Sequence, residues 1–307
     1  MRMVHASVQP KLAARADAGV WRLGTQDGLA LALEHFGDRA APALVFAHGF
    51  GQTRHAWDDT AATLGAQGWH CITTDARGHG ESGWVANGAY DYNQLIDDLA
   101  QIARASTSTD TLPVLVGASM GGLVGLCAQA LHAPLFRALV LVDITPRWEA
   151  AGVARIIGFM RAHPDGFADY SEAADAIAAY LPHRAERYSA DQSRPERLRK
   201  LLIAHADGRL RWHWDPHLLD YIEAHSDGWQ SAIFDAARRI DVPTLLISGL
   251  RSDVVSDATI AEFLELVPHA RHARVDATHM VAGDANTAFA HALQEFLLTL
   301  APTPLPA

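Results

Sequence analysis

The chain has 307 residues, of which 49% are hydrophobic, which is enough for a large buried core. Its formal net charge of −10 at pH 7 lacks the basic excess of a nucleic-acid-binding protein and argues against docking to anionic lipid. Only two cysteines occur, Cys71 and Cys127, so we interpret both as small core residues and not as a disulfide framework.

No segment resembles a secretory signal, and none approaches the roughly 20 apolar residues that a membrane span requires. We therefore expect a cytoplasmic protein that acts on a small molecule and binds neither nucleic acid nor membrane. A homodimer is left open as its oligomeric state.

Short apolar segments alternate with amphipathic ones in the first half of the chain. Continuous apolar runs such as Pro42–His48 are typical of strands that are buried on both faces, and their alternation with helices predicts a mostly parallel sheet. A turn at Asp27-Gly28 joins the first two predicted strands. We predict strands at Val20–Leu23, Leu29–Phe36, Pro42–His48, His70–Thr74, Leu112–Gly117 and Ala138–Ile144, and helices at Thr53–Gly65, Tyr92–Ala105 and Ser119–Leu131.

The pattern changes between Pro146 and Asp235, where the sequence is helical and amphipathic without a convincing strand. Alternation then resumes, with strands predicted at Val242–Ser248 and His272–Asp276 and helices at Ala258–Leu266 and Asn286–Leu300. We predict an α/β core formed by residues 18–145 and 236–300 and a helical cap, residues 146–235, inserted after the sixth strand. Residues 1–17 and 301–307 are expected to be flexible termini.

The segment Gly117-Ala-Ser119-Met-Gly121 lies between a predicted buried strand and a predicted helix. A serine in this position stands on a sharp turn that exposes its hydroxyl, and the small neighbours allow other backbone to approach. The pattern predicts that Ser119 is a nucleophile.

An acyl-transfer site also needs hydrogen-bond donors for the oxyanion that develops on the substrate. The backbone N–H of Met120, which directly follows the nucleophile, is the first candidate. The second is the N–H of Phe50, in the loop after an earlier strand. We expect His48, next to this loop, to brace it and to take no part in catalysis.

The base must be a histidine, because the imidazole pKa suits proton transfer near neutral pH. His279 follows the last strand, so it is expected at the same edge of the sheet as Ser119. His269 and His272 fall at the opposite end of that strand, and His291 falls inside the final helix.

The acid that orients the base has three candidates. Asp253 follows a strand and gives the chain order Ser119, Asp253, His279, which is typical of serine hydrolases with this alternation. Asp143 ends the strand before the cap and is the alternative. Asp257 is the third candidate and stands where it would cap the next helix. We prefer Asp253.

These residues together resemble the α/β-hydrolase superfamily over roughly Val20–Thr145 and Val242–Leu300. His48-Gly-Phe50 is similar to its oxyanion loop, and the run from Asp75 to Ser82 is similar to its Asp-x-Arg-Gly-x-Gly-x-Ser segment, which shapes a loop beside the site. The resemblance implies an α/β-hydrolase fold, a mostly parallel open sheet flanked by helices. Within the superfamily the chain is similar to small bacterial carboxylesterases and to the cofactor-free haloperoxidase or perhydrolase branch.

The cap is expected to cover the site and to supply part of the substrate pocket. Its prominent apolar side chains, Trp212, Trp214, Phe159 and Met160, are the candidates for contact with substrate. The segment Gln192–Arg211 carries six basic residues against two acidic ones, which we interpret as a solvated face, with recognition of a substrate carboxylate as the alternative.

We therefore predict a serine hydrolase that cleaves a small-molecule carboxylic ester through Ser119, His279 and Asp253, with no cofactor and no metal. Ser119 argues against epoxide hydrolase and haloalkane dehalogenase chemistry, because those members of the superfamily attack an alkyl carbon with a carboxylate. The alternatives are hydrolysis of an amide, a lactone or a carbon–carbon bond, a perhydrolase or haloperoxidase side activity, and a cofactor-independent dioxygenase. A non-catalytic receptor built on the same scaffold is a further alternative.

Overall fold

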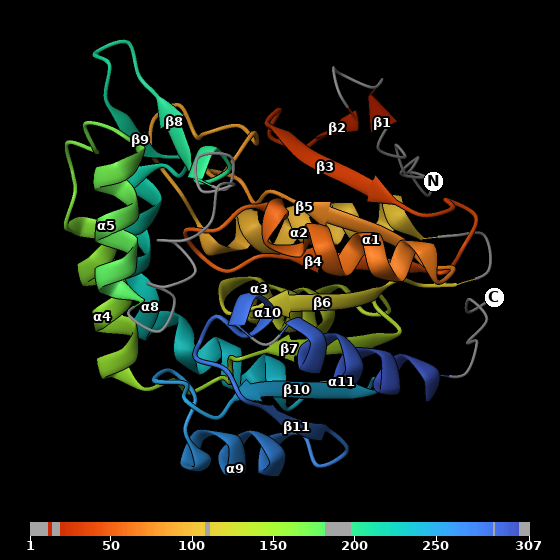
Figure 1. Ribbon diagram of the computed structural model, residues 1–307. Helices are drawn as coiled ribbons and strands as arrows, with labels where there is room; N and C mark the ends of the chain where they lie inside the picture. Colours follow the sequence, from red (N-terminus) through yellow and green to blue (C-terminus); the bar gives the residue numbers. More distant parts are fainter. Residues whose placement is uncertain (1–11, 14–18, 108–110, 182–197, 285, 301–307) are drawn as a thin grey trace, which may run out of the picture.

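The computed structural model describes residues 12–13, 19–107, 111–181, 198–284 and 286–300. A nine-stranded sheet runs through the molecule in the order β1-β2-β3-β5-β4-β6-β7-β10-β11 (Figure 1). Its strands are β1 (Leu12–Ala13), β2 (Val20–Gly24), β3 (Ala30–Phe36), β4 (Ala43–Ala47), β5 (His70–Thr74), β6 (Val114–Ala118), β7 (Ala138–Val142), β10 (Thr244–Gly249) and β11 (Arg271–Val275).

The six strands from β5 to β11 in this order pair in parallel, whereas β1, β2 and β3 pair antiparallel at one edge. Since all six parallel strands point the same way, the loops that follow β4, β6, β7, β10 and β11 gather at one edge of the sheet. Residues predicted in these loops are therefore brought together by the topology, as ligand sites in open α/β sheets usually are.

Helices cover both faces of the sheet. Alternation along β4 directs Val45 to one face and Leu44 and Phe46 to the other. The first face packs against α2 (Tyr92–Ser106), α3 (Met120–His132), part of α8 (Pro216–Ala237) and α9 (Asp257–Leu266). The second packs against α1 (Asp58–Ala66) and α11 (Asn286–Leu298). The predicted α/β-hydrolase architecture, a mostly parallel sheet flanked by helices, is confirmed.

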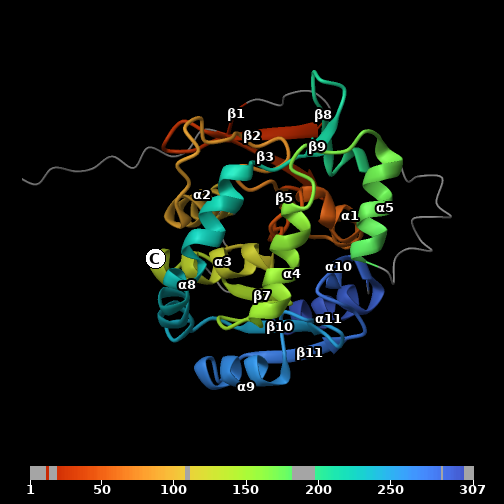
Figure 2. The same cartoon turned by 90° about the vertical axis from the view of Figure 1, so that its left-hand side faces the viewer.

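The segment between β7 and β10 contains α4 (Ala150–Arg161), α5 (Tyr170–Tyr180), β8 (Leu202–Ala204), β9 (Leu210–Trp212) and α8. It lies beyond the carboxyl edge of the sheet, with α4 and α8 in front of α3 in Figure 2. An apolar cluster of its own, which includes Phe167, Ile177 and Leu210, holds α5 and the β8–β9 hairpin together.

Two differences from the predicted elements concern very short strands. We expected no strand in the inserted segment, but β8 and β9 pair antiparallel across a turn that contains Gly208, whose φ is 80°. Within the predicted N-terminal arm, β1 pairs with β2, while residues 1–11 and the tail 301–307 lie outside the described residues. Strands of two or three residues are too short to show an alternating pattern.

Both cysteines are buried and free, as expected, and burial raises the pKa of each thiol to about 12. Within the described ranges, every helix is too short or too polar to cross a lipid bilayer.

Candidate active site

Ser119 stands on the predicted turn between β6 and α3. Its φ of 45° and ψ of −118° are rarely adopted by residues other than glycine, and its side chain makes no capping bond to α3. Two glycines make room for the turn: a Cβ on Gly117 would lie 2.7 Å from the Gly122 nitrogen, and one on Gly121 would lie 2.5 Å from the Ala47 carbonyl oxygen. This local geometry is that of a nucleophile elbow.

His279 and Asp143 form the second part of the site. Nδ1 of His279 lies 2.8 Å from Oδ2 of Asp143, in a pair whose side chains are 13% and 0% exposed. Asp143 follows β7 and His279 follows β11, so the carboxyl edge of the sheet brings together residues that are 136 positions apart.

Further donors hold the Asp143 carboxylate in place. The Gly249 N–H donates to Oδ1 over 2.7 Å, and the Ser252 hydroxyl donates to Oδ2 over 2.5 Å. The backbone of Asp143 has a φ of 50°, which is unusual for a residue with a side chain. A buried carboxylate that accepts three hydrogen bonds and sits on strained backbone has the properties of an orienting acid.

Asp253, which we expected to be the acid, is placed differently. Its carboxylate pairs with Arg155 of α4 over 2.6 Å and is 37% exposed. The Arg155 guanidinium opposes the effect of partial burial and holds the pKa of Asp253 below its usual value. The structure therefore pairs Asp253, the expected acid, with Arg155, and it is the alternative, Asp143, that lies within hydrogen-bond distance of His279. Asp257, the third candidate, is exposed and pairs with Arg274.

The two expected oxyanion donors belong to segments next to Ser119: Met120 follows it in the chain, and a Cβ on Gly49, beside Phe50, would lie 3.2 Å from the Ser119 Cβ. Met120 is the first residue of α3, so its N–H has no carbonyl partner within the helix. In the loop after β4, the Gly49 N–H donates to Gln52 Oε1 and the Gly51 N–H donates to His79 Nε2. Among the described residues, by contrast, none accepts a hydrogen bond from the Phe50 N–H.

This loop is braced by buried histidines. His48 Nε2 accepts from the Ala76 N–H, so its Nδ1–H donates to the Gly49 carbonyl, which agrees with the bracing role expected for this residue. Behind the loop, His213 Nδ1 accepts from the Gly80 N–H. Burial lowers the pKa of His48, of His79 and of His213, the last to about 4, so all three are neutral near pH 7.

The segment from Asp75 to Ser82 also shapes the loop, as its resemblance implies. The buried Asp75 carboxylate accepts from the Arg54 N–H over 2.7 Å and pairs with the Arg54 guanidinium over 2.5 Å. Arg77 binds Asp98 and Asp27. These ion pairs fix the backbone beneath the Phe50 loop.

A cavity opens at Ser119; together with the open solvent at its mouth, it holds about 850 Å³ of empty space. Its walls come from Phe50 and Met120 in the core, from α4 and from α8, and they are mostly apolar. The described lining residues are Phe50, Tyr92, Ser119, Met120, Leu123, Ile144, Trp148, Val153, Ile156, Ile157, Leu219, Tyr221, Ile222, His225, Ser226, Trp229, Ile233 and Val254.

None of the four cap residues expected in the substrate pocket lines this cavity. Phe159 stacks on Tyr180 with ring centroids 4.0 Å apart and also packs against Trp212, within the apolar cluster of the inserted segment. Trp214 packs on the Phe50 ring, and the Met160 methyl lies against Gly51. The pocket residues that sequence reasoning missed, such as Tyr221 and Trp229, face the cavity from α8.

The described basic residues of Gln192–Arg211 are engaged elsewhere. Lys200 pairs with Asp58, Arg211 pairs with Asp207, and Arg209 donates to the carbonyls of Asp165 and Gly166. The guanidinium of Arg199 lies over the Tyr170 ring. Residues 192–197 lie outside the described part of the chain. No described basic residue of this segment lines the cavity.

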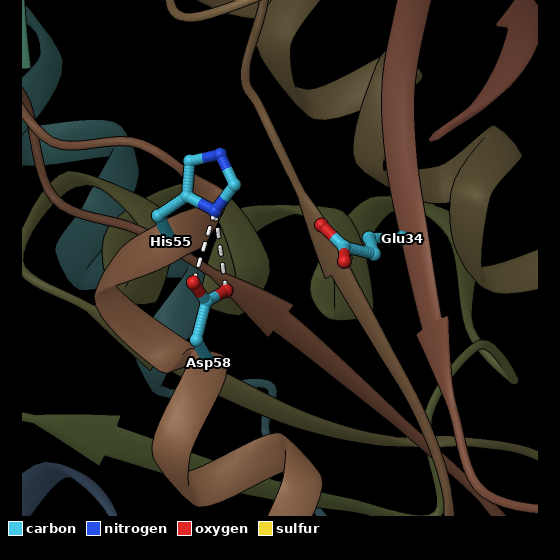
Figure 3. A group of neighbouring side chains, drawn as sticks. All are labelled: Glu34, His55 and Asp58. Atoms are coloured by element: carbon cyan, nitrogen blue, oxygen red, sulfur yellow. Dashed lines mark hydrogen bonds and ion pairs between the residues drawn. The ribbon is translucent and has the colours of Figure 1, made fainter. Parts of the chain in front are cut away.

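One group of side chains has the composition of a metal site within the described ranges. Single ligand atoms of Glu34, His55 and Asp58 lie within 4.8 Å of one another, and Figure 3 shows His55 bonded to Asp58 with Glu34 beside them. Arg54 pairs with Glu34 and Lys200 pairs with Asp58, so cationic side chains already balance both carboxylates. We interpret the group as an ion-pair network.

Comparisons with known proteins agree with this architecture. Residues 42–228 match the family model described as the alpha/beta hydrolase fold. An esterase of Mycobacterium tuberculosis is 27% identical over 259 residues, which cover 80% of this chain and 79% of that protein. A 3-hydroxybutyrate-oligomer hydrolase of Cupriavidus necator is 30% identical over 255 residues, which cover 78% and 83%.

Among solved structures, E-2-(acetamidomethylene)succinate hydrolase superposes with a TM-score of 0.76 at 25% identity, covering 91% of this chain and 99% of that one. The family match spans more than half of the chain. The chain is a member of the α/β-hydrolase family and an enzyme of that superfamily.

Proposed function

We propose that the protein hydrolyses carboxylic esters of small molecules by acyl transfer, with Ser119 as nucleophile, His279 as base and Asp143 as the acid that orients the base. The observation that carries the proposal is the hydrogen bond between His279 Nδ1 and the buried Asp143 carboxylate, at the edge of the sheet where Ser119 stands on its strained turn.

The Asp143 carboxylate determines which imidazole nitrogen carries the proton. Because an ionised carboxylate only accepts hydrogen bonds, the proton of neutral His279 resides on Nδ1 and the lone pair on Nε2. Nε2 is then the atom that removes the Ser119 proton. When His279 becomes a cation, the buried negative charge of Asp143 stabilises it.

The reaction follows in two steps. Ser119 Oγ attacks the ester carbonyl, and the negative charge on the carbonyl oxygen is stabilised by the N–H groups of Phe50 and Met120, beside the positive end of α3. His279 then protonates the leaving alcohol. In the second step it activates a water molecule that hydrolyses the acyl-enzyme.

The nature of the cavity and the relatives support an ester as the substrate. Most of the lining is apolar, which suits a neutral acyl or alkyl group. One of the relatives is named an esterase and another a hydrolase of 3-hydroxybutyrate oligomers, which are esters. The inserted segment, residues 146–235 in our sequence-based division, is proposed to act as a cap that encloses this group.

The proposal is tested by labelling and turnover together. The wild-type protein should react with a fluorophosphonate at Ser119, as located by peptide mass spectrometry, and should hydrolyse short p-nitrophenyl esters. Ser119→Ala should lose both properties while keeping its circular dichroism spectrum. Turnover by Ser119→Ala at the wild-type rate would refute the assignment. Oxygen uptake without release of alcohol would instead indicate a dioxygenase.

A further inference from the structure

The hydroxyl of Ser252 is held in a fixed direction by the backbone of its own loop. Ser252 follows β10, and its N–H closes a turn on the Gly249 carbonyl oxygen over 3.2 Å. The side-chain oxygen accepts hydrogen bonds from the N–H groups of Val254 and Val255 over 3.2 and 3.0 Å. Because a hydroxyl oxygen has two lone pairs, only its hydrogen is left, and this hydrogen is donated to Asp143 Oδ2 over 2.5 Å.

The Ser252 hydroxyl and the His279 ring share one oxygen of the Asp143 carboxylate. Oδ2 lies 2.5 Å from Ser252 Oγ and 2.8 Å from His279 Nδ1. The other oxygen, Oδ1, accepts from the Gly249 N–H over 2.7 Å. The torsion about the Cβ–Cγ bond of an aspartate is broad, so a carboxylate that is held by one fixed donor can turn. A second fixed donor on the other oxygen determines the plane of the carboxylate, and with it the direction from which Oδ2 accepts the His279 proton.

The loop that carries Ser252 is held on its outer side by the inserted segment. A Cβ on Gly152 of α4 would lie 2.0 Å from the Asp253 carbonyl oxygen, so this helix packs directly on the loop backbone. The Glu149 N–H donates to the Val254 carbonyl oxygen over 2.9 Å, and Val254 lines the cavity. The same loop therefore forms part of the pocket wall and contacts the acid.

The other charged side chains in the loops around His279 are paired with one another. Asp253 is close enough to interact electrostatically with His279, and its carboxylate pairs with Arg155. Arg251 pairs with Asp276. Among the described residues, the acid is the one that forms a hydrogen bond with the His279 ring. A change in the behaviour of the base on removal of the loop hydroxyl is therefore expected to act through the acid.

We propose that Ser252 is a positioning residue for the reaction: its hydroxyl orients the Asp143 carboxylate, which holds the His279 proton on Nδ1. Nε2 of His279 is then free to accept the Ser119 proton. The proposal rests on the function assigned to Ser119, because it takes Asp143 as the acid and His279 as the base. A hydrogen bond also stabilises the charge of the carboxylate, so the Ser252 hydroxyl weakens the attraction of Asp143 for the His279 proton. A serine that only stabilised the turn would have neither effect.

The test removes one hydroxyl at a time from the same loop. Ser252→Ala removes the donor to Asp143. Ser256→Ala is the matched control, because this hydroxyl caps α9 and donates to Glu149 Oε1 over 2.5 Å. Each variant is assayed with p-nitrophenyl butyrate over a range of pH, and its thermal unfolding is followed by circular dichroism. Proton NMR in water adds a measurement without substrate, the far-downfield resonance of the His279 Nδ1–H, which is assigned by its loss in His279→Gln.

In Ser252→Ala we expect kcat to be about tenfold lower and KM to change by less than about twofold, because the hydrogen bond acts on the base and not on the substrate. On the acidic side of the profile, the pH at which kcat/KM falls to half of its maximum should rise by roughly half a pH unit, since a carboxylate that has lost a donor favours the His279 cation. The Nδ1–H resonance should shift and broaden. Ser256→Ala should unfold at a lower temperature but keep kcat, the pH profile and the resonance.

The outcomes separate the two proposals. Ester hydrolysis with an unchanged pH profile and resonance in Ser252→Ala, or with equal changes in Ser256→Ala, would overturn the positioning role and leave the esterase function standing. A resonance that responds to Ser252→Ala but not to Ser256→Ala, in a wild-type protein that hydrolyses no ester, would support the positioning role and count against the esterase function.

Discussion

Replacing Asp143 by asparagine should impair catalysis severely while leaving the shape of the site unchanged. The Gly249 N–H donates to Oδ1 of Asp143, so the amide oxygen of asparagine would remain there and its NH₂ group would face His279 and Ser252. A donor in that place favours the tautomer of His279 with its proton on Nε2. In that state the ring cannot accept the Ser119 proton.

The expected loss in kcat is about 10⁴-fold, the order seen when the acid of a serine-protease triad becomes an amide, and it corresponds to roughly 5 kcal/mol of activation free energy. Asp253→Asn is the matched control. It breaks only a partly exposed ion pair with Arg155 and should change kcat by less than about threefold.

The assay is the steady-state hydrolysis of p-nitrophenyl butyrate, with folding checked by circular dichroism. A loss of three or more orders of magnitude in Asp253→Asn, together with near-normal kcat in Asp143→Asn, would refute the assignment of the acid. That result would mean that His279 forms its hydrogen bond with Asp253 during turnover.

Three further predictions concern stability and the pocket. Burial lowers the pKa of His213 to about 4, so the unfolded state binds a proton at this histidine first. The free energy of unfolding should therefore fall by about 1.4 kcal/mol per pH unit for this histidine as the pH decreases from about 6.5 towards 4. Urea unfolding at several pH values should show a smaller loss in His213→Asn, and an equal loss would contradict the argument. Ile156→Trp should fill part of the cavity. It should lower kcat/KM for p-nitrophenyl octanoate at least about tenfold more than kcat/KM for p-nitrophenyl acetate, whereas an equal decrease for both esters would place the acyl chain elsewhere. Arg54→Gln leaves the buried Asp75 without its cation and should cost about 3–5 kcal/mol of unfolding free energy in urea. Arg22→Gln, at a partly exposed ion pair, should cost less than about 1 kcal/mol, and equal costs would argue against a buried ion pair.

The long buried strands and the nucleophile elbow could be predicted from the sequence, because in these segments the local residue pattern agrees with the burial in the folded protein. Pro42–Ala47 is apolar throughout, and β4 is buried at every position on both faces. Gly117 and Gly121 could be recognised because a side chain at either position would collide with neighbouring backbone at the turn. The β8–β9 hairpin was missed because its strands are held by contacts such as that between Phe167 and Leu210, which no short pattern reveals.

The choice between Asp143 and Asp253 could not be made from chain order, because both residues follow strands at the same edge of the sheet. Two tertiary facts separate them: the positive φ of Asp143, and Arg155 of α4, which engages Asp253. Neither is visible in local sequence.

The pocket was missed for a similar reason. Size and aromatic character selected Trp212 and Phe159, but these side chains fill the interior of the inserted segment. The cavity is lined instead by residues of α8 spaced three to four apart: Leu219, Ile222, Ser226, Trp229 and Ile233. This spacing marks one face of a helix and was the available signal.

The central claim is that Ser119 carries the acyl group between the two steps. Wild-type enzyme mixed rapidly with p-nitrophenyl butyrate, quenched in acid and analysed by intact-mass and peptide mass spectrometry provides the most direct test. We expect a transient mass increase of one butyryl group on the peptide that contains Ser119, formed as fast as the initial burst of p-nitrophenol. Turnover with a butyryl group on another residue, or a burst without any covalent adduct, would contradict the account.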